Sequence, residues 1–244
     1  MNIINDPSIT VDECREWLKT KNKCNGIVFD LLDTMWFASI RNGIDPCVLL
    51  AQSLIETDYF TNKINLFNRN TGNLRDVSPF KKYGGYTTFD SWIKGIHAHA
   101  DHLALCAGAN GFPKRSIRSK KLYRNGLTMF KLNELTFDPM HFEYLMGTCT
   151  KVEHLYNEER KNHDYAQKIV ELVNEMIEFT KRTKEIEMNN KVDILTTNFK
   201  KLKEEHNDLY KELNMMKDAV SDLLEIKLEF CKIIKLLEKI MYNK

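Results

Sequence analysis

The sequence predicts a mainly α-helical protein, in which an α-rich globular domain is followed by a C-terminal coiled-coil helix. Apolar residues recur at helical spacing through 27–43 and 45–56. Toward the C-terminus the composition changes, because neither Gly nor Pro occurs after Gly147 and Lys, Glu, Leu and Asn dominate. The 244 residues, 43% of them hydrophobic, suffice for one sizeable core with an extension. We expect three segments: an N-terminal helical lead at 1–26, the globular domain at 27–180 and the coiled coil at 181–244.

The first two predicted helices have clear boundary signals. Thr10-Val-Asp-Glu13 has the spacing of a capping box, which predicts a short helix that starts there. The next helix is amphipathic and spans 27–43, where Asn42-Gly43 ends it. Its apolar residues are expected to share one buried side: Val28, Leu31, Leu32, Met35, Trp36 and Ile40.

The third predicted helix carries a single acid, Glu56, near its C-terminal end. Asp45 is placed to cap the helix, and Pro46 stands at the first helical position, where a missing N–H has no cost. Its other residues are mostly apolar, so the helix should pass through a core. A carboxyl group in apolar surroundings keeps its proton more readily, as a general acid requires. The alternative is a helix-end Glu that faces solvent.

The middle of the chain mixes helix breakers with a further helix. Asn70-Thr-Gly-Asn73, Ser78-Pro79 and Gly84-Gly85 predict irregular or β-hairpin structure across 61–90. Helical spacing returns at 89–107. A basic run then follows at 114–121, which is either a solvated face or an attractor for anionic polymers.

The C-terminal segment shows a heptad repeat over seven heptads, which predicts a coiled coil. Thirteen of the fifteen a and d positions are apolar, and His206 and Lys227 are the exceptions. A seam of this length, about 75 Å at 1.5 Å per residue, needs a partner. Self-association is the first expectation. The alternatives are a different protein, such as a phage or lysis partner, and the return of the same helix if it breaks. The a and d residues are Val192, Leu195, Phe199, Leu202, His206, Leu209, Leu213, Met216, Val220, Leu223, Lys227, Phe230, Ile234, Leu237 and Met241.

Several short motifs together resemble one enzyme family. Ala51-Gln-Ser-Leu-Ile-Glu-Thr57, followed by Asn65-Leu-Phe67, is similar to the helix end and the next segment of the glucosaminidases that hydrolyse peptidoglycan (glycoside hydrolase family 73, lysozyme-like superfamily). The resemblance extends over about residues 27–180. Further similar segments follow in the family's order: Phe80–Tyr83, Asp90–Leu103, Asp138-Pro139, Val152–Leu155 and Tyr165–Ile169.

The resemblance implies a lysozyme-like α-rich domain with a short irregular or β-hairpin cleft wall. It implies an endo-β-N-acetylglucosaminidase that cleaves the β-1,4 bond between N-acetylglucosamine and N-acetylmuramic acid, with Glu56 as the catalytic acid. No metal or other cofactor is implied. Two alternatives remain: a muramidase or lytic transglycosylase on a related fold, and a catalytically weak wall-binding or structural module.

The remaining site residues are assigned with alternatives. The resemblance implies a second carboxylate near the hairpin, but no Glu occurs between Glu56 and Glu134. Asp76 either activates a water there or pairs with its neighbour in a turn, and the 2-acetamido group of the substrate could serve instead. Tyr83 is assigned as catalytic from the family's F-x-x-Y element, and Tyr86 as a sugar-stacking residue. Asn65 and Asn68 either bind N-acetyl groups or cap turns.

Composition narrows the partners. The net charge of +2 is nearly balanced and gives no argument for nucleic acid. No apolar run is long enough for a membrane span. The six cysteines lack metal-like spacing, and Cys47 and Cys106 are expected to be small buried residues. The N-terminus lacks a signal peptide, which favours a phage endolysin or tail lysin that is made in the cytoplasm and reaches the wall after release or on a virion.

Overall fold

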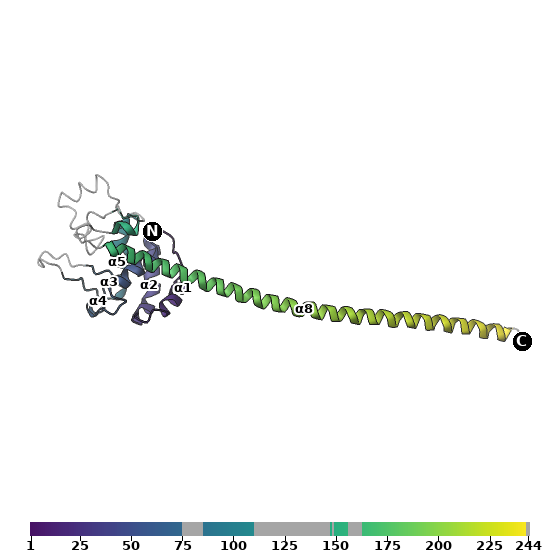
Figure 1. Ribbon diagram of the computed structural model, residues 1–244. Coiled ribbons are helices and arrows are strands. Elements are labelled where there is room, and N and C mark those ends of the chain that lie inside the picture. Colours follow the sequence, from purple (N-terminus) through teal and green to yellow (C-terminus); the bar gives the residue numbers. More distant parts are fainter. Residues whose placement is uncertain (75–84, 110–146, 148, 156–162, 243–244) are drawn as a thin grey trace. The chain divides into compact units, whose positions relative to one another are not determined.

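The computed structural model describes residues 1–74, 85–109, 147, 149–155 and 163–242, and this part is mainly helical (Figure 1). No strand occurs in these ranges, and an isolated antiparallel bridge joins Asn2 to Lys151. The elements are α1 (Val11–Lys19), α2 (Ile27–Asn42), α3 (Pro46–Glu56), α4 (Lys63–Asn68), α5 (Trp92–Ala107), the 3-10 turn η1 (Val152–Leu155) and α8 (His163–Tyr242).

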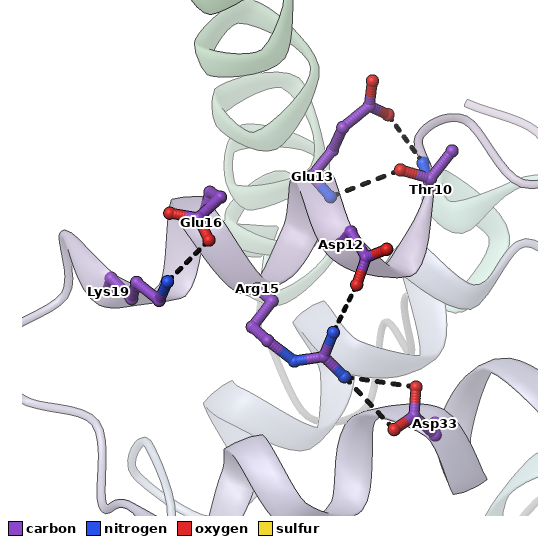
Figure 2. A network of polar contacts seen from close by, with 7 residues as sticks. All are labelled: Thr10, Asp12, Glu13, Arg15, Glu16, Lys19 and Asp33. Carbon is purple, nitrogen blue, oxygen red and sulfur yellow. Dashed lines mark hydrogen bonds and ion pairs between the residues drawn. The ribbon is translucent and has the colours of Figure 1, made fainter.

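The chain divides into two compact units, which we call the first unit (Met1–Thr183) and the second unit (Lys184–Lys244). Residues 1–26 belong to the first unit, because Trp17 and Leu18 of α1 are buried in the same core as α2, α3 and α5. Figure 2 shows Arg15 of α1 reaching Asp12 on its own helix and Asp33 on α2. The N-terminal helix is therefore packed as part of the globular unit.

Three predicted helix boundaries are confirmed, whereas the helix predicted at 89–107 begins at Trp92, after the N-cap Ser91. Thr10 Oγ1 accepts from the backbone N–H of Glu13 at 3.2 Å, and the Glu13 carboxylate accepts from the backbone N–H of Thr10 at 2.8 Å (Figure 2). Gly43 ends α2 in the left-handed conformation, with φ of 69°. Asp45 caps α3 by accepting from the backbone N–H of Cys47 at 2.9 Å. These ends form locally, which is why sequence spacing predicts them.

Helix α2 differs from its prediction at one residue. Val28, Leu31, Leu32, Met35 and Trp36 are buried as expected, but the side chain of Ile40 is 54% exposed. The last turn of α2 is tied to α5 by polar contacts instead: Asn42 donates to Asp101 at 2.8 Å and Arg41 pairs with it at 3.1 Å. Helical spacing placed Ile40 on the apolar side, and the position of α5 leaves it in solvent.

Helix α3 passes through the core, as its apolar composition predicts. The side chains of Val48, Leu49, Leu50 and Leu54 are completely buried. Cys47 and Cys106 are also buried, which confirms that prediction. The first turns of α8 complete this core with three further buried residues: Ile169, Val173 and Met176.

The irregular segment predicted at 61–90 contains a short helix, α4, that was not expected. Asn62 caps it by accepting from the backbone N–H of Ile64 at 2.9 Å. After α4 the chain turns at Arg69, and the segment 87–89 returns alongside, since Thr87 N donates to Leu74 O and Phe89 N donates to Asn68 O. The part between these segments, 75–84, lies outside the described residues.

The second unit is helical from Lys184 to Tyr242, as the heptad pattern predicts. Every side chain described in it, up to residue 239, is exposed, including the apolar a and d residues. In the ranges that the structure describes, no helix is both long and apolar enough to span a membrane.

Candidate active site

Glu56 is the last residue of α3, and both of its carboxylate oxygens accept hydrogen bonds from distant segments. The hydroxyl of Tyr165, on α8, donates to Oε1 at 2.5 Å. The side-chain amide of Asn73 donates to Oε2 at 2.6 Å and to the backbone oxygen of Glu56 at 2.9 Å. The side chain is half-buried. The carboxylate is thus fixed in one orientation at the end of a buried helix.

Tyr165 is a permanent donor to this carboxylate. Burial raises the pKa of its phenol well above 10, and the neighbouring charge of Glu56 raises it further. The phenol of Tyr165 therefore keeps its proton at neutral pH. Its oxygen accepts in turn from the side-chain amide of Gln52, on α3, at 3.0 Å.

The hydrogen bonds continue from Gln52 into the core and share one direction. Gln52 Oε1 lies 3.1 Å from His99 Nε2, so this nitrogen carries the proton and donates. His99 Nδ1 then accepts from Thr71 Oγ1 at 3.2 Å; Ser53 Oγ is also near, at 3.3 Å, but donates to the backbone oxygen of Leu49. Each donor in the series Thr71, His99, Gln52 and Tyr165 points toward Glu56.

His99 is neutral in the folded protein, because complete burial lowers its pKa to about 3. In the unfolded chain a histidine has a pKa of about 6.5. Between these values only the unfolded state binds the proton, so the contribution of His99 to stability is full above pH 6.5 and falls as the pH falls toward 3.

This gives a pH-dependent prediction. Between pH 6 and pH 5 the unfolding free energy of the wild type should fall by about 1 kcal/mol more than that of His99→Gln, which lacks the titrating group. Urea unfolding at both pH values measures the difference. Equal losses in the two proteins would mean that His99 is protonated in the folded state.

Asn73 is held by a second set of polar contacts, from α4. The side-chain amide of Asn65 donates to the backbone oxygen of Asn70 at 3.0 Å and to Oδ1 of Asn73. Asn70 in turn accepts from the backbone N–H of Leu74 at 2.9 Å. Asn73 has φ of 51°, a left-handed conformation that Asn tolerates. The turn 70–74 therefore presents its amide to Glu56.

The other predicted site residues fall into two groups. Asn65 and Asn68 are buried, and their side chains bond within the protein, Asn68 by accepting from Thr88 Oγ1 at 2.8 Å. These bonds are of the kind that the structural alternative predicts, and N-acetyl binding by the two residues stays a prediction. The side chain of Tyr86 is 40% exposed, and its predicted role in stacking on a sugar stays a prediction. Two predicted catalytic residues, Asp76 and Tyr83, lie outside the described residues.

A left-handed turn follows Glu56. Asp58, Tyr59 and Phe60 have φ of 48°, 56° and 60°. This conformation costs L-residues energy, and here the buried Phe60 ring and the bond from the Phe60 N–H to Thr57 Oγ1, 2.9 Å long, hold it in place. Asp58, two residues after Glu56, is the first residue of this turn.

Replacing Asp58 by Gly should therefore stabilise the protein. Gly adopts positive φ without steric cost, and we expect a gain of about 0.5–1 kcal/mol in unfolding free energy. The matched control is Asp30→Gly in the right-handed helix α2, which should lose a few tenths of a kcal/mol. Thermal or urea unfolding measures both, and a loss at Asp58 would contradict the strain.

Five residues that are hydrogen-bonded to Glu56 directly or through this series were not assigned roles from the sequence: Gln52, Thr71, Asn73, His99 and Tyr165. Gln52 and Tyr165 belong to segments that resemble the glucosaminidases, and this was the available signal. His99 also lies in such a segment, Asp90–Leu103. Within the ranges that the structure covers, no group of three or more His, Cys, Asp or Glu side chains is placed to hold a metal ion.

Comparisons with known proteins give no relative: no family model, no curated protein and no solved structure matches the chain. The function of the site is therefore proposed from its geometry, its chemistry and the motifs of the sequence. The central feature is one carboxylate with two fixed donors, at the end of a buried helix.

Proposed function

We propose that the protein is a peptidoglycan hydrolase with a lysozyme-like fold, in which Glu56 is the general acid. The observation that carries the proposal is the orientation of Glu56 by Tyr165 and Asn73, which come from 109 and 17 residues away in the sequence. A Glu that only interacts with solvent does not require a hydrogen-bond network that extends into the core as far as His99. A general acid requires a fixed orientation, because its proton must point toward the leaving oxygen.

Hydrolysis of a glycosidic bond requires a proton on the leaving oxygen as the bond to the anomeric carbon breaks. Glu56 supplies that proton in the proposed reaction. The carboxylate that remains is negatively charged, and the hydroxyl of Tyr165 and the amide of Asn73 already point at its oxygens. Donors fixed before the reaction stabilise the charge that develops in the transition state without reorganising.

The choice of substrate is supported by the resemblance of Ala51–Thr57 and the segments after it to the glucosaminidases. In the proposed reaction the enzyme cleaves the β-1,4 bond on the reducing side of N-acetylglucosamine in glycan strands. The anomeric carbon is attacked either by a water that a second carboxylate activates, with Asp76 as the candidate, or first by the 2-acetamido oxygen of the substrate, in which case water then opens the cyclic intermediate.

The test is the loss of turbidity of purified peptidoglycan, with mass analysis of the released fragments after reduction. Reducing ends of N-acetylglucosamine are expected. Reducing ends of N-acetylmuramic acid would identify a muramidase, and anhydro ends a lytic transglycosylase, with Glu56 as the acid in either case. An absence of clearing and of new reducing ends would contradict the hydrolase and favour a wall-binding module.

A further inference from the structure

The second unit presents a continuous apolar face that the residues described in that unit leave uncovered. On its helix Leu195, Phe199, Met216 and Leu223 are each 64–69% exposed. Burying a side chain of this size contributes about 1.5–3 kcal/mol. Over the whole heptad repeat this is a strong driving force for association with another helix.

The opposite side of the helix is built for solvent. Lys211 pairs with Asp208 at 3.1 Å, and Lys232 pairs with Glu229 at 2.7 Å. These four residues occupy c and f positions, away from the a and d seam. The f positions, opposite the seam, are polar throughout, whereas four exposed apolar residues stand at b and c positions: Ile194, Met215, Leu228 and Leu236.

The e and g positions, which flank the a and d seam, differ in polarity between the first and the second part of the helix. Up to Lys217 the e and g positions are polar except for the aromatic Tyr210. From Ala219 onward they are apolar with one exception, Glu238. The first part contains Thr196, Asn198, Lys203, Glu205, Tyr210, Glu212 and Lys217. The second part contains Ala219, Leu224, Ile226, Cys231, Ile233, Glu238 and Ile240.

We infer that the second unit assembles with further copies of itself as a parallel, in-register helical bundle. In this arrangement the apolar flanks of one copy meet the apolar flanks of the next. The g residue Glu212 also lies beside the e residue Lys217 of the neighbouring copy, an attractive pair. An antiparallel arrangement would instead place the apolar flanks against Lys203, Glu205 and Glu212.

The width of the apolar face sets the number of copies at three or more. A two-stranded coiled coil buries mainly the a and d positions. Beyond Ala219 the a, d, e and g positions of this helix are apolar except for Lys227 and Glu238, so each helix has apolar surface for a neighbour on both sides. The polar a residues His206 and Lys227 each share a layer with their own copies, and a polar a position is a known device for fixing register.

Sedimentation equilibrium of the full-length protein tests the assembly. The expected mass is three or more times that of one chain. Leu223→Asp, at a d position, should dissociate the assembly, whereas the control Ser221→Asp adds the same charge at an outward b position and should leave the mass unchanged. A mass of one or two chains for the wild type, or dissociation by Ser221→Asp, would overturn the proposal.

Cysteine cross-linking tests the direction, in the full-length chain with Cys231→Ser. Parallel in-register copies bring their d positions together, so Leu195→Cys alone should form a disulfide between chains on oxidation. In the antiparallel arrangement that aligns the two seams, position 195 of one copy meets position 234 of another. Cross-links that appear only when Leu195→Cys is mixed with Ile234→Cys would therefore overturn the proposed direction.

The charged pair gives an independent test. Lys217→Glu places two Glu residues together and should weaken association roughly two- to five-fold per pair. Adding Glu212→Lys to the same chain restores an attractive pair and should recover the affinity. Additive weakening by the two substitutions would contradict the pairing of positions 212 and 217. None of these measurements depends on the proposed hydrolase activity.

Discussion

Glu56→Gln should abolish most of the clearing of peptidoglycan, with a rate about 100- to 10,000-fold below that of the wild type. General acid–base catalysis contributes rate factors of this size. Gln has nearly the same shape as Glu but cannot deliver a proton. Its side-chain oxygen can still accept from either Tyr165 or Asn73, so the fold should be retained. The rates are measured by turbidity and by the release of reducing ends.

The matched control is Glu187→Gln, on an exposed residue of the second unit. It removes the same charge and so reproduces any effect of net charge on binding to an anionic wall. Its rate should equal that of the wild type. If Glu56→Gln cleared peptidoglycan at the wild-type rate while folded by circular dichroism, Glu56 would not be the acid.

Gly95→Ala should destabilise the first unit by about 3 kcal/mol. Gly95 lies in α5, where an added Cβ would stand 1.9 Å from the backbone oxygen of Arg69 and 3.2 Å from Phe89 Cδ2. The backbone oxygen cannot rotate away, so α5 and the turn after α4 must separate. Ala is a better helix former than Gly by about 1 kcal/mol, which is too little to compensate.

This separation would also reach the proposed site, because the turn that begins at Arg69 carries Asn70 and Asn73. Reduced activity is expected along with the lower stability. The control is Gly26→Ala, where an added Cβ meets no atom within 4 Å and φ is −54°. Its stability should stay within about 1 kcal/mol of the wild type. A stable, active Gly95→Ala protein would contradict the close packing.

The sequence was sufficient to predict those features that depend on neighbouring residues. The capping box at Thr10, the N-cap at Asp45 and the left-handed Gly43 involve only neighbouring residues. The burial of α3 follows from its apolar composition, and the long C-terminal helix follows from its heptads and from the lack of Gly and Pro. Glu56 could be chosen as a candidate because it is the only acid on a predicted buried helix.

Tertiary structure alone decided which side chains surround that acid. Tyr165 lies 109 residues from Glu56, and His99 is connected to Glu56 through Gln52 and Tyr165, so no local spacing could relate them. The exposure of Ile40 depended in the same way on where α5 packs. Local interactions determine helices and their ends, whereas burial and hydrogen-bond partners depend on which distant surfaces meet.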